Sequence, residues 1–185
     1  MSSPLTSLPA GLPIPVDDGL AAHLLGMALP NLLLESTSGK QVNLAAIPGC
    51  LVIYVYPLSG RPGVPLPDGW DEIPGARGCT PQACDFRDHH QELQHLNATV
   101  YGLSSQTTDY QVELKNRLHL PFDLLSDSGF ELKQSLSLPV FEVADSLFYK
   151  RLTLIAEDQI IKKIFYPIFP PNRHADQVVD WLKSH

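Results

Sequence analysis

Two cysteines five residues apart are the side chains of this sequence best suited to chemistry. They stand in residues 78–88 (GCTPQACDFRD), where the spacing of apolar side chains predicts that a loop becomes a helix. Pro81 is compatible with the first helical turn, where a missing N–H costs no hydrogen bond. Cys79 would then lie at the amino end of the helix, whose unpaired N–H groups and positive dipole favour a thiolate. The thiolate is the nucleophilic form of cysteine and the form that peroxides oxidise.

The spacing of these cysteines sets a mechanical condition on any bond between them. In a regular helix, Cα atoms five positions apart lie roughly 8.7 Å from each other, given 3.6 residues per turn and a rise of about 1.5 Å. A disulfide requires a Cα separation of about 4.4–6.8 Å. A bond between Cys79 and Cys84 therefore requires the first helical turn to unwind. We interpret Cys79 as the reactive thiol and Cys84 as its resolving partner.

Composition narrows the class of protein. The chain has 185 residues, of which 44% are hydrophobic and 18% are charged, which suits one globular domain with a proper core. A formal charge of −7 argues against a nucleic-acid-binding surface. Three cysteines do not make a disulfide framework, and no apolar run approaches the roughly 20 residues that span a bilayer. Because the N-terminus also lacks a secretory signal pattern, we expect a cytoplasmic protein that binds neither membrane nor nucleic acid.

The order of apolar runs and turn residues predicts an α/β domain with a mixed sheet covered by helices. We expect an irregular N-terminal extension over residues 1–25 and the domain over residues 26–185. The β-rich apolar run of residues 51–56 predicts a central buried strand, and the many prolines and glycines of residues 57–78 predict a long loop. Further strands are expected at residues 31–35, 41–44, 99–104, 122–125, 151–156 and 160–166, and helices at residues 20–27, 80–97, 107–118, 129–136 and 173–183.

Over residues 26–183 the chain resembles the peroxiredoxins, and within them the peroxiredoxin Q group, also called bacterioferritin comigratory proteins. The cysteine motif of residues 78–88 is the most specific part of this resemblance. It is supported by the opening hairpin, by the strand that ends in Pro57, and by the strand that bears Arg151. The resemblance implies a thioredoxin-like fold, in which helices flank a mixed central sheet and an N-terminal hairpin opens the domain.

The resemblance also implies a thiol-dependent peroxidase that reduces hydrogen peroxide and organic hydroperoxides. Cys79 would become a sulfenic acid, and Cys84 would then form a disulfide with it. Arg151 would stabilise the thiolate and the developing charge, and Pro57 would be the family's active-site proline. Thioredoxin or a glutaredoxin-like dithiol would reduce the disulfide, with no metal or organic cofactor. Members of this group tend to be monomers or weak dimers.

The chain departs from the family pattern in the active-site loop. A threonine or serine usually stands three residues before the reactive cysteine, and this chain has Ala76 there. If Pro57 is the family's proline, residues 58–78 are an inserted active-site loop between that proline and the cysteine. Ser59, Thr80 or backbone N–H groups could take over the role of the missing hydroxyl.

The same residues allow other interpretations. A redox relay or a redox sensor with little peroxidase activity would use the same cysteine pair, and a sensor would change a partner interaction when its helix unwinds. Cys50 is interpreted as a small buried residue. His89, His90 and His95 are interpreted as structural or solvated, because adjacent histidines point to different sides of a helix and the cysteine spacing is unusual for zinc.

Overall fold

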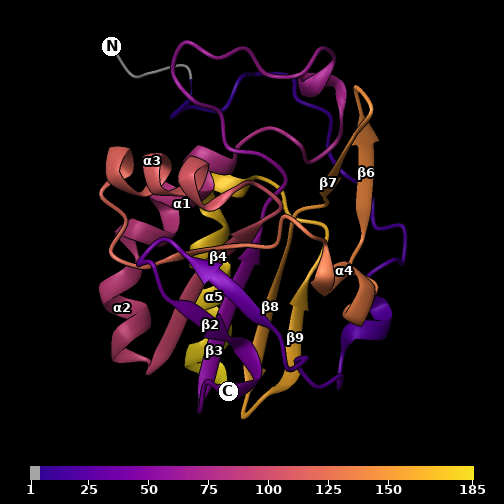
Figure 1. The fold of residues 1–185 in the computed structure, drawn as a ribbon. Coiled ribbons are helices and arrows are strands. Elements are labelled where there is room, and N and C mark those ends of the chain that lie inside the picture. Colours follow the sequence, from indigo (N-terminus) through magenta and orange to yellow (C-terminus); the bar gives the residue numbers. More distant parts are fainter. Residues whose placement is uncertain (1–4) are drawn as a thin grey trace.

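Seven strands form a mixed sheet at the centre of the molecule (Figure 1). The computed structural model describes residues 5–185, and the strand order of its sheet is β2-β1-β5-β4-β3-β8-β9. The middle strand β3 (Cys50–Val55) runs parallel to β4 (Ala98–Ser104) and antiparallel to β8 (Leu152–Glu157). All side chains of β3 after the first are buried, as its continuous apolar run predicts.

Four further strands extend the sheet on both sides of this centre. β1 (Leu33–Ser36) lies antiparallel between β2 (Gln41–Asn43) and β5 (Leu124–Ser126), and β5 is parallel to β4. At the other edge, β9 (Ile160–Phe165) forms an antiparallel hairpin with β8. The parallel and antiparallel pairs together confirm the predicted mixed α/β fold.

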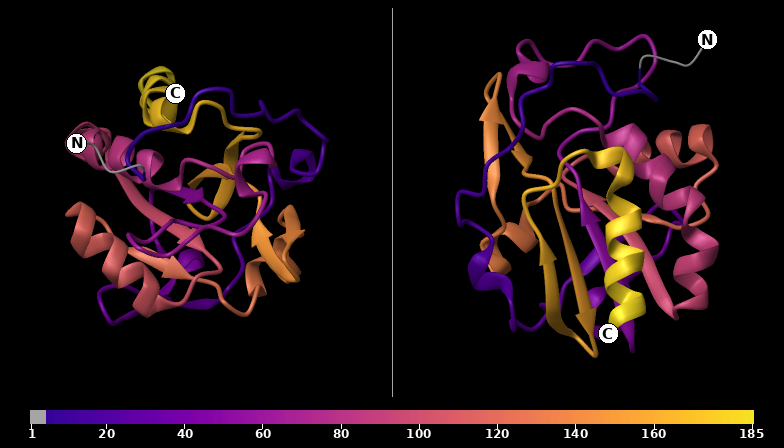
Figure 2. Two further views of the ribbon diagram at one scale, coloured as in Figure 1. Left: turned by 90° about the horizontal axis from the view of Figure 1, so that it is seen from above. Right: turned by 180° about the vertical axis from the view of Figure 1, so that it is seen from behind.

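Helices cover one face of the sheet around an aromatic core. α1 (Cys79–Asp88), α2 (His90–His95) and α5 (His174–Ser184) lie side by side on this face, as the rear view in Figure 2 shows. Their apolar side chains pack with Val52 and Tyr54, two alternate side chains of β3. The core on this face therefore holds α1, and with it the two cysteines, against the central strand.

A second apolar core lies on the opposite face, where the other alternate side chains of β3 point. α4 (Glu131–Leu136) and the short 3₁₀ helix η1 (Ala22–Leu24) contribute to it, and η1 is all that forms of the helix expected at residues 20–27. α3 (Thr108–Leu118) packs into the first core. No helix within the described part of the chain is long and apolar enough to cross a membrane.

Two elements differ from the sequence predictions. The helix expected over residues 80–97 is divided into α1 and α2 at His89, whose backbone (φ −95°, ψ 1°) leaves the helical region. The hairpin of β6 (Val140–Val143) and β7 (Ser146–Tyr149) was not predicted. Its turn places an Ala-Asp pair at φ of 50° and 57°, where asparagine and glycine are the usual residues.

The N-terminal segment and the long loop after β3 lie together above one end of the sheet (Figures 1 and 2). The loop contains the short 3₁₀ helix η3 (Trp70–Glu72). The Trp70 ring packs against Phe141 and Phe148 of the β6–β7 hairpin, with centroid distances of 5.6 and 5.0 Å. The unpredicted hairpin therefore holds the loop in place over the amino end of α1.

Candidate active site

Cys79 is the first residue of α1 and is only 4% exposed. The chain enters the helix through Gly78 at φ 109°, a conformation that glycine adopts without strain. A Cβ at Gly78 would also lie 2.5 Å from Cγ of Pro171, so a larger residue does not fit there. Further along α1, Phe86 stacks on Tyr54 of β3 with ring centroids 4.4 Å apart. These contacts fix the thiol at the buried amino end of a helix, as predicted from the sequence.

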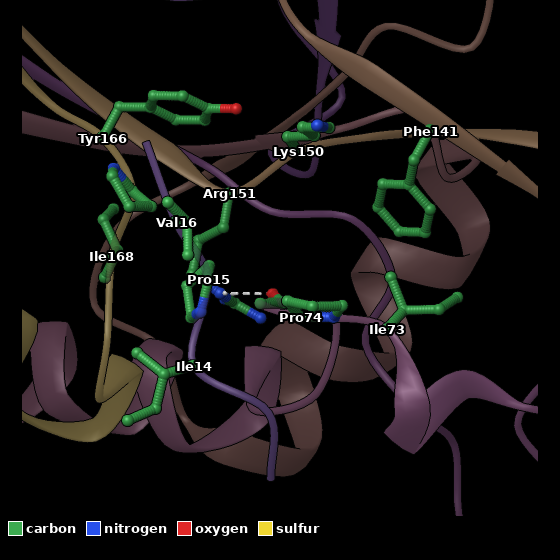
Figure 3. A pocket seen from close by; sticks show the side chains of 12 residues that line it. Ile14, Pro15, Val16, Ile73, Pro74, Phe141, Lys150, Arg151, Tyr166 and Ile168 are labelled. Atoms are coloured by element: carbon green, nitrogen blue, oxygen red, sulfur yellow. Dashed lines mark hydrogen bonds between the residues drawn. The ribbon is translucent and has the colours of Figure 1, made fainter. Parts of the chain in front are cut away.

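Arg151, which directly precedes β8, places its guanidinium beside the sulfur of Cys79. Nη2 lies 3.2 Å from Sγ and also donates to the carbonyl oxygens of Ala76 at 3.0 Å and Arg77 at 3.2 Å. Nε donates to the carbonyl oxygen of Gly75 at 3.2 Å, the bond drawn in Figure 3. The side chain thus ties the end of the long loop to the first turn of α1.

The guanidinium of Arg151 is buried without a carboxylate partner. The residue is 4% exposed, and among residues 5–185 its hydrogen bonds run to carbonyl oxygens, an amide oxygen and the sulfur. A buried charge without a counter-charge is costly. The sulfur of Cys79 is therefore held against a fixed, buried cation.

Gln82 is a further member of the site that the sequence analysis did not single out. It is fully buried, and its Oε1 accepts a hydrogen bond from Nη1 of Arg151. Its Nε2 has no hydrogen-bond partner within the described residues, which leaves a donor for an oxygen atom of a bound molecule. The sequence could have indicated Gln82, because it stands three residues after Cys79 and so lies on the same face of the helix.

The structure separates the candidates for the missing hydroxyl. Ser59 is fully buried and donates its hydroxyl to Oε1 of Gln106 at 3.0 Å, so that proton is already engaged. Thr80 lines the same small cavity as Cys79. Pro57 is buried and lies two residues beyond the end of β3. Ala76 contributes its carbonyl oxygen to Arg151, and its methyl side chain has no donor.

Cys84 lies within α1, and both it and Cys79 are free thiols. Cys84 is half-buried, and this burial raises the pKa of its thiol. Because residues 79–84 are helical here, the Cα separation of roughly 8.7 Å still forbids a disulfide unless the first turn unwinds. The structure therefore represents the reduced state, in which the first turn of α1 is helical. The disulfide state would have this turn unwound.

Cys50 begins β3 at the end of the strand remote from Pro57. It stands five positions before Val55, which corresponds to about 17 Å at a rise of roughly 3.3 Å per residue. Burial, together with the Glu157 carboxylate, raises the pKa of Cys50 to about 11. This thiol is therefore poorly placed and poorly ionised for the chemistry of α1.

The histidines where α1 meets α2 pack against the protein in different ways. His89 lies between two carboxylates, with Nε2 at 2.8 Å from Asp176 and Nδ1 at 3.4 Å from Asp85. His90 packs against the Phe122 ring at a centroid distance of 5.6 Å. Within residues 5–185, no three His, Cys, Asp or Glu side chains are grouped so that they could hold a metal ion.

Arg151 and Cys79 line two different cavities. The cavity that Cys79 lines has a volume of only about 10 Å³. The other, of about 300 Å³, is lined by Arg151 and by mostly apolar side chains, among them Ile14, Ile73 and Phe141 (Figure 3). The smaller of these two cavities therefore lies beside the nucleophile and the larger beside the arginine.

His174, at the start of α5, is buried beside this site and makes a pH-dependent contribution to stability. Its Nε2 lies 2.8 Å from Oγ1 of Thr153, and Phe86 and Phe165 pack edge-on against its ring. Burial and the nearby Arg151 charge lower the pKa of His174 to about 4 from its ordinary 6.5, despite a hydrogen bond with Gln177. The folded protein therefore keeps this ring neutral where the unfolded chain protonates it.

Stability is expected to decrease as the pH falls from 6.5 toward 4, because the unfolded state binds the additional proton. His174→Gln should remove up to about 3 kcal/mol of this pH dependence. Urea unfolding of both proteins at several pH values measures the effect. The difference in unfolding free energy at pH 7.5, where the ring is neutral in both states, corrects for altered packing. If the unfolding free energies of the two proteins changed in parallel with pH, His174 would not be the source of the pH dependence.

Comparison with known proteins places these features in a family. The family model described as Redoxin matches residues 24–179. Peroxiredoxin Q of the chloroplast of Oryza sativa subsp. japonica is 29% identical over 160 residues, which cover 86% of this chain and 66% of the relative. The corresponding protein of Populus jackii is 28% identical, with 86% and 68% covered. The match thus spans about two thirds of the length of these relatives.

Solved structures share the fold. Peroxidoxin BcpB from Mycobacterium tuberculosis has a TM-score of 0.70 at 22% identity, over 86% of this chain and 96% of that chain. Peroxiredoxin Q from Xanthomonas campestris has a TM-score of 0.68 at 24% identity, again over 86% and 96%. Residues 5–23 lie before the region that the family model matches.

Proposed function

Because this chain belongs to the redoxin family, and within it to the peroxiredoxin Q group, we propose that it is a thiol-dependent peroxidase with Cys79 as its peroxidatic nucleophile. The observation that carries the proposal is the 3.2 Å contact between Cys79 Sγ and Arg151 Nη2. A fixed cation and a helix amino end act on the same buried sulfur. Peroxides oxidise cysteine as the thiolate.

In the proposed first step, the Cys79 thiolate attacks the terminal oxygen of a hydroperoxide. An S–O bond forms as the O–O bond breaks, so the sulfur is oxidised by two electrons to a sulfenic acid. The leaving hydroxide or alkoxide takes up a proton and departs as water or alcohol. Arg151 would stabilise the charge that develops on the oxygens, and Nε2 of Gln82 would donate a second hydrogen bond.

In the second step, the first turn of α1 unwinds and Cys84 attacks the sulfenic sulfur. The new S–S bond replaces the S–O bond, and the hydroxyl leaves as water. Thioredoxin or a glutaredoxin-like dithiol would then reduce the disulfide by exchange. Pro57, buried after β3, is assigned as the family's active-site proline.

The finer assignments belong to the same proposal. We assign residues 26–185 to the peroxiredoxin domain and residues 1–25 to an extension, and we expect a monomer or a weak dimer without cofactor. A cytoplasmic location is proposed because three cysteines without a disulfide framework suit a reducing compartment.

A redox sensor or relay is the second candidate, and the side chain of Ala76 favours it. The family's hydroxyl is absent at this position, and the Ser59 hydroxyl is engaged with Gln106. Such a protein would form the same disulfide but would consume peroxide slowly.

The proposed function is tested by adding one equivalent of hydrogen peroxide to the reduced protein and quenching over seconds. Intact mass and peptide mapping should show rapid loss of two hydrogens and a Cys79–Cys84 link. Thioredoxin-coupled turnover then measures the complete cycle. No reaction over minutes, or oxidation spread over Cys50 and the methionines, would overturn the peroxidase proposal, and slow formation of the same disulfide would favour the sensor or relay.

A further inference from the structure

Residues 5–16, here called the N-terminal strap, lie across the amino end of α1 beside the long loop (Figures 1 and 2). The strap contains no helix or strand and precedes the residues that the family model matches. It therefore lies outside the part of the chain that the family model describes. The strap is therefore placed where it can limit access to Cys79.

The strap approaches the loop at three glycines. A Cβ at Gly60 would lie 2.6 Å from Cδ2 of Leu5, and a Cβ at Gly78 would lie 2.7 Å from Cδ2 of Leu8. A Cβ at Gly75 would meet the Pro15 ring at 3.5 Å. Since real Cβ atoms do not approach another atom below about 3 Å, a side chain at Gly60 or Gly78 would displace the leucine that contacts it. The loop thus offers a surface without side chains on which the strap rests.

Leu5 of the strap also forms part of the wall around the nucleophile. The cavity of about 10 Å³ at Cys79 is lined in part by Leu5 of the strap and by apolar residues of the loop. That volume is near the lower limit for a single water molecule. Hydrogen peroxide, with two heavy atoms, requires a small displacement of these walls, whereas a hydroperoxide with a bulky alkyl or aryl group requires the wall to open. The apolar wall residues are Leu5, Leu58, Leu66 and Trp70.

The strap is attached in a way that allows such opening. Ile14 and Val16, at its carboxyl end, are 67% and 84% exposed. Leu5 and Leu8 are half-buried, and they rest on glycines rather than in a deep apolar pocket. Leu5 and Leu8 are therefore the strap side chains whose truncation tests its effect on the site.

We propose that the N-terminal strap is a size-selecting lid, in which Leu5 and Leu8 restrict Cys79 to hydrogen peroxide and the smallest hydroperoxides. The inference rests on the proposed function, because it names the substrate class of that same site. Bulky organic hydroperoxides react only when the strap is displaced. The lid acts by excluding volume and leaves the chemistry at the sulfur unchanged.

The test compares Cys79 oxidation by hydrogen peroxide and by cumene hydroperoxide in the full chain. The Leu5→Ala/Leu8→Ala variant should raise the rate ratio of cumene hydroperoxide to hydrogen peroxide by about tenfold, as expected when a few methylenes are removed from an excluding wall. Leu20→Ala, a matched change at a side chain that is 49% exposed and outside the cavity, should leave the ratio unchanged. An unchanged ratio in the double variant would overturn the lid.

Gly60→Ala provides an independent way to displace the strap. Gly60 does not have a positive φ, and its new Cβ would meet the flexible end of Leu5. The variant should therefore change the ratio in the same direction as the double variant while all strap residues are retained. Gly129→Ala, whose Cβ would meet only Glu131 at 3.7 Å, is the control.

A second readout separates this inference from the proposed function. Alkylation of Cys79 by iodoacetamide and by N-phenylmaleimide, quantified by peptide mapping, measures access for small and bulky reagents without any peroxide. Both opening variants should increase the rate with the bulky reagent relative to the small one. If peroxide oxidised Cys79 in none of the proteins, the proposed function would fail, whereas equal alkylation ratios in wild type and variants would refute the lid alone.

Discussion

Cys79→Ser is expected to lower the rate of peroxide consumption by roughly three orders of magnitude or more. The serine hydroxyl remains protonated beside Arg151 and is a weak nucleophile, although it fits the same space. Stopped-flow fluorescence can measure the reaction, because Trp70 lines the cavity of Cys79 and should respond to its oxidation. Peroxide consumption at the wild-type rate by the serine variant would place the nucleophile elsewhere.

Cys84→Ser is the matched variant, because it makes the same substitution five residues later in the same helix. It should reduce one equivalent of peroxide and then stop, since the sulfenic acid at Cys79 has no thiol to attack it. Trapping with dimedone and intact mass identify that state. Cys50→Ser should cycle like the wild type, because Cys50 lies at the opposite end of β3. Steady turnover of Cys84→Ser with thioredoxin would show that another thiol resolves the sulfenic acid.

The cysteine pair could be recognised from the sequence because the information is local. The pair, the first-turn proline and the apolar face of the helix all fall within one short segment, and the structure forms α1 there. The central strand could also be predicted, since a strand covered on both faces is apolar throughout. In both elements the local pattern of apolar residues indicates which side chains are buried, and no distant contact is needed to predict them.

The role of Arg151 could be predicted only weakly from the residues around it. It stands 72 residues from Cys79, and a single arginine before a strand has many possible roles. The resemblance to the family singled it out, and the structure shows its guanidinium 3.2 Å from the sulfur. Gln82 was overlooked because a buried glutamine has no periodic signature, although its spacing from Cys79 on the helix was available.

The N-terminal strap and the β6–β7 hairpin could not be predicted for a different reason. The strap has no periodicity, and its contacts depend on glycines more than 50 positions away that lack side chains of their own. The hairpin turns through an Ala-Asp pair that the usual turn preferences do not favour. Both features depend on long-range packing, and both shape the surroundings of Cys79.

Arg151→Met is expected to slow the oxidation of Cys79 by roughly 10²- to 10³-fold. The substitution removes the cation 3.2 Å from the sulfur and the donor for the developing oxygen charge. It also leaves the carbonyl oxygens of Gly75, Ala76 and Arg77 without their buried donor, so unfolding should become easier by about 1–3 kcal/mol. Stopped-flow oxidation and urea unfolding measure the two effects separately.

Arg151→Lys and Lys150→Met distinguish the charge from the hydrogen bonds. A lysine at position 151 keeps the charge, yet it cannot reproduce a planar guanidinium that contacts five acceptors, so part of the rate should return while most of the stability loss remains. Lys150→Met removes a neighbouring cation whose partner is Asp18 at 2.6 Å on the surface, and it should leave the oxidation rate unchanged. If Arg151→Met reacted at the wild-type rate under conditions where it is folded, Arg151 would be a structural residue. If Lys150→Met slowed the oxidation of Cys79 as much as Arg151→Met does, the effect would come from the general positive potential of the site. The contact between Arg151 and the sulfur would then have no special role.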